Sequence, residues 1–486
     1  MATGKTLDQF REAHDPTFQR NIGTNFSRTL RKTAKCFLIV AAQNATPVEE
    51  HWWAVIQQIA KHRKAEILVI PIRYKNPTSQ WSASADNAEW WDPKVREYLW
   101  SVRHRLHPKL TLLADLKIQP TAVDPLTGAE AISLEQSGII GLTKLQMKTV
   151  ATPAARMAKI LTTTGACTIE NYTDSRAGRI AEFHHSLSAV LVELDGRYFH
   201  LRHVHFDKKT RSAIDMNTQY GAVGLYKAPR PLALSMGDTH VRAIDPRVEA
   251  ATFGAGGMIE TLNPRHVIYH DVLDCYMGSP HHEMDPFIGV AKAKAGGTVE
   301  AEVEQAINFI AARTKGDRIS VVVGSNHNDM LGRWLKRIDW KKDPINACFY
   351  LRTASRVAEQ ARLLRKGAEY PDPFTTLIRD RKLKNVWVLD DDESFMLGGV
   401  ELGLHGDRGP NGARGSTRNL RRIGVKSIKG HDHTPAIDEG CYSNGTSTLL
   451  RLDYNKGPSS WLNAHTLLHA DGKRQIVVIV DGRWRA

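Results

Sequence analysis

Short apolar runs and amphipathic segments alternate along the chain, and this alternation predicts an α/β protein. The run 36–42 is apolar and is bounded by Asn44 and Pro47, as expected for a core strand. Apolar positions recur at helical spacing over 49–64, which predicts an amphipathic helix. The apolar run 66–72 predicts a second strand, so the chain begins with a strand, a helix and a strand.

A hairpin is predicted later in the same part of the chain. Asp195-Gly196 separates strand-like segments at 189–194 and 197–204, and this dipeptide is the strongest short-range hairpin signal. Pro229 and Pro231 then precede a new buried run, so we place a boundary near residue 225. This division predicts an N-terminal arm (1–30), an N-terminal α/β domain (31–225) and a second domain (226–486). Further strands of the first domain are expected at 110–116, 139–142 and 159–164.

The second domain also alternates between predicted strands and helices. Strands are expected at 232–236, 267–270, 319–323, 386–389, 401–404, 425–429 and 448–452, and helices at 299–315 and 353–366. Two last strands, 466–469 and 476–480, would be joined through Asp471-Gly472.

Composition places the chain among globular proteins. Hydrophobic residues make up 42% and charged residues 24%, which is typical of folded domains. No apolar run approaches the roughly 18 residues that a membrane span requires, and the N-terminus lacks the pattern of a secretory signal. The five cysteines form no C-x-x-C pair, which argues against a disulfide framework and a thiolate zinc site. We therefore expect a cytoplasmic protein without a membrane partner.

The charge balance is basic, with 66 Lys and Arg against 52 Asp and Glu and a net charge of +14. A surface of this sign attracts polyanions and speeds encounter with them. The charge alone does not distinguish DNA, RNA and acidic membranes as partners.

Side chains that can ligate metals follow five of the predicted strands. Asp238 and His240 are two residues apart, so both point the same way from an extended segment and suit one metal ion. Asp271 follows a buried strand, where a carboxylate can bridge two cations about 3.5–4 Å apart. An amide oxygen comes from Asn326, and further imidazoles come from His405, His431 and His433, while the adjacent His327 can reach a scissile phosphate as a general acid. The whole set indicates a dinuclear metal site.

The order D-x-H, D-x-x-D, N-H, H and G-H-x-H resembles the calcineurin-like metallophosphoesterase superfamily, which includes nucleases of DNA double-strand-break repair. The match covers residues 230–440. It implies a sandwich of two mixed β-sheets flanked by helices. It also implies that a metal-bridging hydroxide attacks phosphorus and that His327 is the general acid. The implied ligands are Asp238, His240, Asp271 and His433 for one ion, and Asp271, Asn326, His405 and His431 for the other.

Three positions depart from the motifs of this superfamily. His270 stands where a glycine is usual before Asp271, Ser325 replaces the glycine before Asn326, and Asn328 replaces an acidic residue. The partner of His327 is therefore open, and Asp274 is the candidate that would orient it. The ligands include no thiolate, which fits two divalent ions of Mn²⁺, Fe²⁺, Zn²⁺ or Ni²⁺. Nucleases that resemble this chain commonly use Mn²⁺.

A Gly-rich, basic segment, 407–422, separates two of the motifs and is expected to form a mobile loop at the rim of the metal site. Flexible arginines beside such a site suit a polymer backbone, because phosphate contacts carry affinity without reading sequence. A solvated surface loop is the alternative. The candidate DNA-binding residues are Arg408, Arg414, Arg418 and Arg421. A second basic group over 333–342 contains Trp334 and Trp340, which could stack on bases or belong to the core.

We therefore predict a metal-dependent nuclease, and specifically a DNase. The pattern of the whole chain also resembles the host-DNA-degrading early proteins of T5-like bacteriophages, which implies a homo-oligomer in the cytoplasm of an infected bacterium. The alternatives are a phosphatase or phosphodiesterase of the same fold, acting on a small molecule or phosphoprotein, and a non-catalytic nucleic-acid-binding protein.

Three other groups of polar residues are assigned no function. His281-His282-Glu283 and Asp390–Glu393 are interpreted as solvated loop and turn residues. His465 and His469 are spaced so that they could share a helix face, and they are interpreted as structural.

Overall fold

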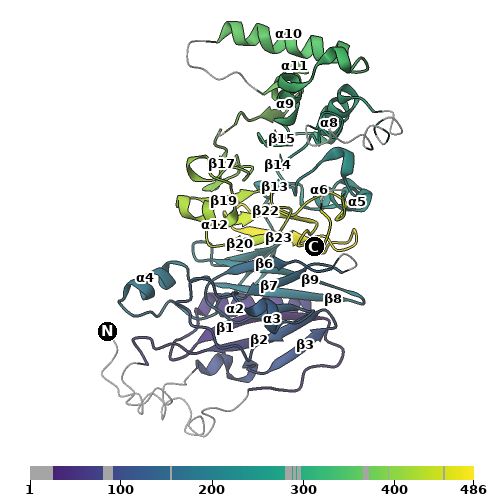
Figure 1. Ribbon diagram of the computed structural model, residues 1–486. Helices are drawn as coiled ribbons and strands as arrows, with labels where there is room; N and C mark the ends of the chain where they lie inside the picture. The colour runs from purple at the N-terminus through teal and green to yellow at the C-terminus, as the bar shows by residue number, and fades with distance from the viewer. Residues whose placement is uncertain are drawn as a thin grey trace.

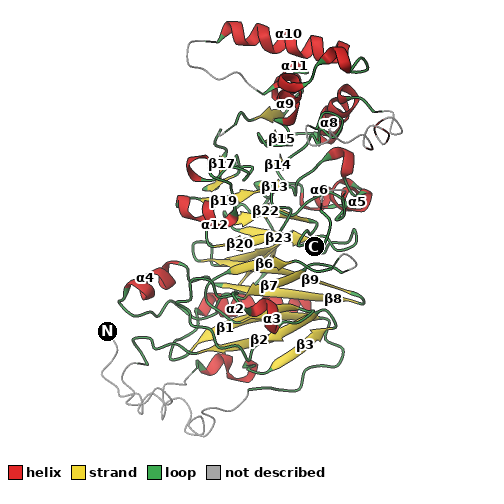
Figure 2. Cartoon of the chain, in the orientation of Figure 1, coloured by secondary structure: helices red, strands yellow, loops and turns green. Residues whose placement is uncertain are grey.

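The structure is a computed structural model that describes residues 26–79, 91–153, 156–279, 287, 290, 292, 297–364, 372–391, 393–452 and 455–486. Figures 1 and 2 show strands stacked along the length of the molecule, with helices α8 to α11 gathered at the end away from the N-terminus. The strands form three sheets flanked by helices, which confirms the predicted α/β class. Residues 1–25 of the predicted arm and the His281-His282-Glu283 group lie outside the described residues.

A seven-stranded sheet forms the N-terminal end of the molecule. Its order is β12-β11-β10-β9-β8-β1-β2. Helix α2 (Glu50–Arg63) connects the parallel strands β1 and β2, and the side chain of Glu49 caps its first turn. The predicted hairpin is confirmed as β8 and β9. The strands are β1 (Cys36–Gln43), β2 (Glu66–Ile72), β8 (Ser188–Asp195), β9 (Tyr198–Asp207), β10 (Ser212–Asp215), β11 (Thr218–Gly221) and β12 (Leu225–Lys227).

A six-stranded sheet forms the centre of the C-terminal half, in the order β16-β15-β14-β13-β22-β23. Strands β13 to β16 are parallel, and β22 and β23 form an antiparallel hairpin beside β13. The strands are β13 (Ala233–Ser235), β14 (His266–Tyr269), β15 (Ile319–Val322), β16 (Val386–Val388), β22 (Ala464–Leu468) and β23 (Arg474–Val478). The associated helices are α5 (Pro246–Phe253), α6 (Met258–Leu262), α8 (Val299–Arg313), α9 (Met330–Arg337), α10 (Ala347–Leu363) and α11 (Pro373–Asp380).

A ten-stranded sheet joins the two halves through an antiparallel pair between β20 and β6. Its order is β17-β18-β19-β21-β20-β6-β7-β5-β4-β3. The strands are β3 (Arg103–His107), β4 (Leu110–Leu113), β5 (Ser137–Ile140), β6 (Gln146–Val150), β7 (Lys159–Thr163), β17 (Met396–Leu397), β18 (Val400–Glu401), β19 (Lys426–Lys429), β20 (Ala436–Asp438) and β21 (Cys441–Ser443). The shorter helical segments are η3 (Pro93–Tyr98), α3 (Ala129–Ile132), α4 (Arg176–Phe183), η4 (Val241–Ala243), η6 (Trp340–Lys342), η7 (Pro410–Gly412), α12 (Thr417–Leu420) and η8 (Arg421–Ile423).

The apolar core follows the alternation of side chains along the strands. In β1, Ile39 belongs to a cluster that spans all three sheets, while Leu38 and Val40 pack in a cluster that includes α2. In β14, Ile268 joins the cluster shared by the sheets, and Val267 packs with α8 and its neighbours. Successive residues of a strand point to opposite faces of its sheet. The seven-stranded and six-stranded sheets therefore each bury both faces. The ten-stranded sheet therefore shares one core with both halves.

Several predictions about local secondary structure were wrong. The predicted strand 448–452 is absent from the described residues there, because the Thr448 backbone N–H donates to the hydroxyl of Thr446 instead of to a strand. The predicted loop 407–422 contains the helical turns η7 and α12. His465 lies in β22 and not on a helix. Among the described helices, none is both long and apolar enough to cross a membrane. The division of the chain near residue 225 stays a prediction.

Candidate metal centre

The candidate site lies where strand ends of two sheets meet. Asp238 follows β13, Asp271 follows β14 and Asn326 follows β15, and these parallel strands end at one edge of the six-stranded sheet. The open edge formed by such strand ends is the usual place for ligands in α/β proteins. His240 also follows β13, whereas His405 follows β18 and His431 follows β19 of the ten-stranded sheet.

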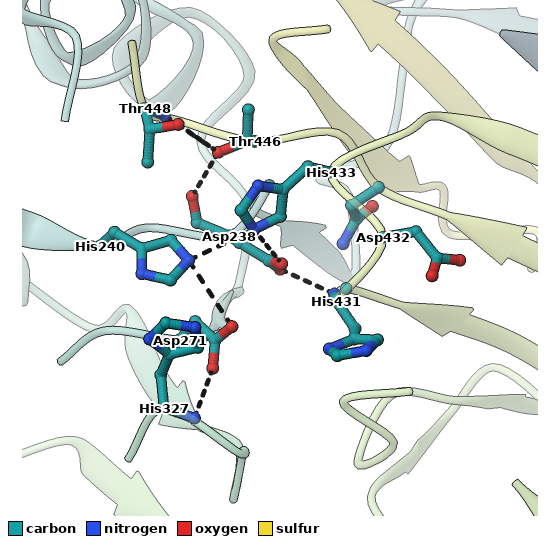
Figure 3. Close-up of polar contacts among 12 residues, drawn as sticks. Asp238, His240, Asp271, His327, His431, Asp432, His433, Thr446 and Thr448 are labelled. Atoms are coloured by element: carbon teal, nitrogen blue, oxygen red, sulfur yellow. Dashed lines mark hydrogen bonds and ion pairs between the residues drawn. The ribbon is translucent and has the colours of Figure 1, made fainter. Parts of the chain in front are cut away.

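The first group of potential ligands surrounds Asp238. Figure 3 shows the side chains of Asp238, His240, Asp271 and His433 turned toward one another. Nε2 of His433 lies 3.0 Å from Oδ2 of Asp238 and 3.2 Å from Nε2 of His240. Nε2 of His240 lies 3.6 Å from Oδ2 of Asp271. One ligand atom from each of these four buried residues lies within 4.8 Å of the others, so this first donor set could hold a metal ion.

A second group of donor atoms also includes Asp271. Oδ1 of Asn326 lies 3.0 Å from Nε2 of His405 and 3.1 Å from Nδ1 of His431. Nε2 of His405 also lies 3.2 Å from Oδ2 of Asp271. We call Asp271, Asn326, His405 and His431 the second donor set. Asp271 is the member that the two sets share.

Two features of the first donor set fit a cation. The Nε2 atoms of His240 and His433 face each other at 3.2 Å, where at most one of them can donate a proton to the other. Oδ2 of Asp238 is buried and makes no hydrogen bond to a described residue, although His433 lies close to it. Unpaired buried acceptors are costly, and a divalent ion would satisfy them.

The backbone at the site is in an unusual conformation. The left-handed backbone conformation costs about 1–2 kcal/mol for a residue that has a Cβ atom. Several such residues at one place must therefore be held by their surroundings. The contacts described above supply part of this support. The residues concerned and their φ angles are His240 (38°), Asp271 (44°), His431 (73°) and His433 (54°).

Gly430 allows the chain to approach Asp238 closely. A Cβ atom at this position would lie 2.2 Å from Oδ1 of Asp238 and 2.9 Å from the side chain of His270. The neighbouring backbone N–H of His431 donates to the same Oδ1 atom at 3.1 Å. The glycine of the G-H-x-H motif is therefore required by a contact between two elements.

The electrostatics of the site favour ionised carboxylates. Burial alone would raise the pKa of Asp271, but the imidazoles of His405 and His327 hold it well below its usual value. Burial alone would lower the pKa of His405, but Asp271 and Asp238 raise it to about 9. The site thus holds two buried carboxylates surrounded by imidazoles. A divalent cation can bind in such an environment in place of the protons.

His327 and Asp274 lie beside the first donor set. The ring centroids of His327 and His240 are 4.5 Å apart. Nδ1 of His327 lies 3.3 Å from the carbonyl oxygen of Asp274, whereas the Asp274 carboxylate accepts from Nδ1 of His240 at 3.1 Å. Nε of Arg242 donates to the other carboxylate oxygen at 2.8 Å. Asp274 thus orients His240 through its side chain and reaches His327 through its backbone.

The four arginines predicted to bind DNA differ in their surroundings. Arg408 donates to Asp329 at 3.1 Å and to Asp391 at 2.9 Å, and Arg418 donates to Asp124 at 3.3 Å. The side chain of Arg421 is only 8% exposed and is paired with Asp438 at 2.6 Å. Arg414 is exposed. Their role toward a substrate stays a prediction.

Three residues near the site were assigned no role from the sequence. Arg242 binds Asp274, and the ring of Trp461 lies 4.1 Å from that of His433. Nε2 of His270, the residue that departs from the superfamily motif, lies 3.2 Å from the hydroxyl of Ser235. Arg242 and His270 are close in sequence to His240 and Asp271, whereas only a contact between distant segments brings Trp461 to the site.

The fold and the site define the class of protein: a mixed α/β protein with a buried Asp/His cluster that could hold metal. The chain is 30% identical to Protein A1 of Escherichia phage T5 over 477 residues, which cover 94% of this chain and 84% of the phage protein. The chain therefore belongs to the family of Protein A1. No protein-family model and no solved structure matches it.

Proposed function

We propose that the chain is a two-metal phosphodiesterase that cleaves DNA. The observation that carries this proposal is the shared position of Asp271 between two donor sets. Two ions held side by side can clamp the attacking and the leaving oxygens of a phosphodiester. The order of the motifs, which resembles calcineurin-like metallophosphoesterases, supports the same reaction.

The donor sets suit divalent ions of the first transition series. They offer carboxylate and amide oxygens with imidazole nitrogens and no thiolate, which fits Mn²⁺ and also Fe²⁺, Zn²⁺ or Ni²⁺. We propose two Mn²⁺ ions. When bound, such ions neutralise the charge of a phosphate and lower the pKa of an adjoining water.

The residues beside the donor sets have distinct proposed roles. His327 would stabilise or protonate the leaving oxygen, because its ring lies against that of His240. Asp274 would keep His240 oriented through the 3.1 Å hydrogen bond to Nδ1. Arg242 would hold the Asp274 carboxylate in place from its other side.

DNA as the substrate is supported by charge and by family membership. The chain carries a net charge of +14, and Arg414 and Arg418 are exposed in the segment that leads from His405 to His431. Membership in a bacteriophage protein family fits the proposed breakdown of host DNA in an infected cell. Assembly into a homo-oligomer stays a prediction.

The proposal is tested by incubating the purified chain with plasmid DNA and with p-nitrophenyl phosphate, with EDTA or with Mn²⁺. We expect plasmid loss in Mn²⁺, none in EDTA, and recovery when Mn²⁺ is restored. Asp271→Asn and His327→Ala should each slow the loss by at least about 100-fold, because even residues around metal ligands are worth about 10–100-fold. The matched controls are Asp115→Asn, in a surface ion pair with Arg103, and the half-buried His51→Ala.

Two results would count against the proposal. Plasmid that stays intact with every divalent metal would exclude a DNase. Faster hydrolysis of p-nitrophenyl phosphate than of DNA, at equal concentrations of phosphoester, would favour the phosphatase alternative.

A further inference from the structure

A cavity of about 430 Å³ lies at the end of β19 away from the metal centre. Lys426, at the start of β19, lines this cavity, whereas His431 follows the end of the same strand. The strand rises about 3.3 Å per residue, so its four residues separate the two sites by roughly 10 Å or more. The cavity is also lined by residues at the end of α4, in β9 and in the turn between β22 and β23. Figure 1 shows α4 and α12 on the same side of the molecule.

The charge of the cavity is strongly positive. Five cationic side chains and one carboxylate, that of Glu439, line it. Nζ of Lys144 lies 2.9 Å from Glu439, and Arg421 and His184 lie within 3.8 Å of the same carboxylate. The negative charge of Glu439 is therefore already compensated. The cationic residues are Lys144, Arg421, Lys426, Lys473 and Arg474.

Three of these cations form no ion pair within 4.0 Å of a carboxylate among the described residues. Lys426 has Lys473 and Arg474 as its charged neighbours, and both are positive. Burial and these two charges lower the pKa of Lys426. Lys473 is within electrostatic range of Asp207. Arg474 is buried, donates to the carbonyl oxygens of Ser427 and Gly440, and lies 3.9 Å above the ring of Tyr442.

Two uncharged features of the lining point to a ligand that is more than a bare anion. Nε2 of His205 is buried and has no hydrogen-bond partner among the described residues. Phe183, the last residue of α4, lines the cavity and is 83% exposed. An exposed aromatic ring beside cationic side chains is the combination that binds a base and its phosphate.

We propose that this cavity binds a nucleoside phosphate, with the phosphate on Lys426, Lys473 and Arg474 and the base against Phe183. Its volume lies within the roughly 300–1,000 Å³ range of small-molecule pockets. The ligand is either a free mononucleotide or one nucleotide of a nucleic-acid strand, since both present the same groups. The proposal does not depend on the metal chemistry, because none of the donor-set residues lines the cavity.

The test measures binding to the full-length chain in EDTA, so that no probe is cleaved. The probes are 5′-dAMP, inorganic phosphate and a fluorescein-labelled single-stranded dT oligomer. Lys426→Glu with Lys473→Glu should weaken binding of dAMP or of the oligomer by at least about tenfold, and each lost phosphate contact should lower the salt slope of oligomer binding by about one. Neither lysine forms an ion pair within 4.0 Å among the described residues, and Arg474 is left intact to preserve folding.

Matched charge reversal elsewhere is the control. Lys315→Glu with Lys384→Glu changes the net charge equally at two exposed positions in the six-stranded half, and it should weaken binding by less than about threefold. Phe183→Ala should weaken binding of dAMP or of the oligomer by about tenfold without affecting phosphate.

The outcomes separate the sources of the ligand. Binding of dAMP that competes with the oligomer would identify a mononucleotide site, and binding of the oligomer alone would identify a site for a strand. Equal losses in the two double variants would mean that bulk charge alone is responsible and would overturn the proposal. Inorganic phosphate that binds as tightly as dAMP and the oligomer would also overturn it, and so would unchanged affinity in Phe183→Ala.

Discussion

At the scale of single residues, the site depends on how closely its segments approach. Gly430 has no side chain, and this lets the segment before His431 pass within hydrogen-bonding distance of Asp238. The backbone N–H of His431 then donates to Oδ1 of Asp238, while Oδ2 of the same carboxylate faces the first donor set. Adding one methyl group at Gly430 tests whether the position of the Asp238 carboxylate matters for activity.

We expect Gly430→Ala to lower DNA cleavage by about 100-fold, because a misplacement of about 1 Å at reacting groups can cost that much. The new Cβ atom would lie 2.2 Å from Oδ1 of Asp238 and would push the carboxylate away. Gly221→Ala is the matched control, since its nearest neighbour would lie at 3.4 Å, an ordinary van der Waals contact. Plasmid cleavage and Mn²⁺ affinity are measured for both variants. Similar values for the two would show that the contact with Asp238 is unimportant.

The sequence predicted the identity of the residues that meet at the site but not their contacts. Asp238, Asp271 and Asn326 were recognised because each follows an apolar strand, and parallel strands end at one edge. The left-handed backbone at His240 and His433 could not be predicted, since it is imposed by contacts between segments far apart in sequence. For the same reason, the sequence could not predict that the Asp274 carboxylate binds the side chain of His240.

At the scale of elements, a buried ion-pair network joins α2, β9 and β10. Asp215, at the end of β10, is fully buried and accepts from Arg202 of β9 at 2.5 Å and from Arg63 of α2 at 2.7 Å. Gln475 of β23 donates to the same carboxylate at 3.1 Å. Burial alone would raise the pKa of Asp215, but Arg202 and Arg63 hold it well below its usual value.

We expect Asp215→Asn to destabilise the protein by about 3–5 kcal/mol at pH 7, the usual cost of leaving buried charges unpaired. Because the folded pKa is lowered, this stabilisation is complete above the unfolded pKa of about 4 and is lost as the pH falls below it. The difference in urea unfolding between wild type and variant should therefore be constant from pH 7 to 5 and smaller at pH 3.5. Asp115→Asn, in an exposed pair, should cost at most about 1 kcal/mol. A difference that grows at low pH would contradict the assignment.

The elements that were predicted correctly are those with long apolar runs. The run that became β1 and the Asp-Gly hairpin of β8 and β9 carry strong local signals. Strands β6 and β20 were missed, because both are short, β6 carries several polar residues, and both depend on pairing with neighbouring strands. Thr448 was placed in a strand, although hydroxyl groups bind the backbone there.

At the scale of the whole molecule, the ten-stranded sheet crosses the boundary that the sequence predicts near residue 225. Strand β20 of the C-terminal half pairs with β6, and Thr149 of β6 donates to the carbonyl oxygen of Pro435. Gln475 of β23 donates to the carbonyl oxygen of His203 in β9. The candidate metal centre, built partly on β18 and β19, therefore rests on a sheet that the N-terminal half completes.

This continuity leads to a prediction about the isolated C-terminal half. A chain of residues 226–486 keeps every residue of both donor sets but leaves β20 as an unpaired edge, and exposed edges promote aggregation. We expect this chain to aggregate or to lack a cooperative thermal transition in circular dichroism, and to gain no stability from Mn²⁺. Mixing it with residues 1–225 should restore the transition and a rise in melting temperature on addition of Mn²⁺, because a bound ligand stabilises only the folded state. Cooperative unfolding of 226–486 alone, with a melting temperature that rises in Mn²⁺, would instead show that the half beyond residue 225 is an independent domain and that the sheet merely joins two finished parts.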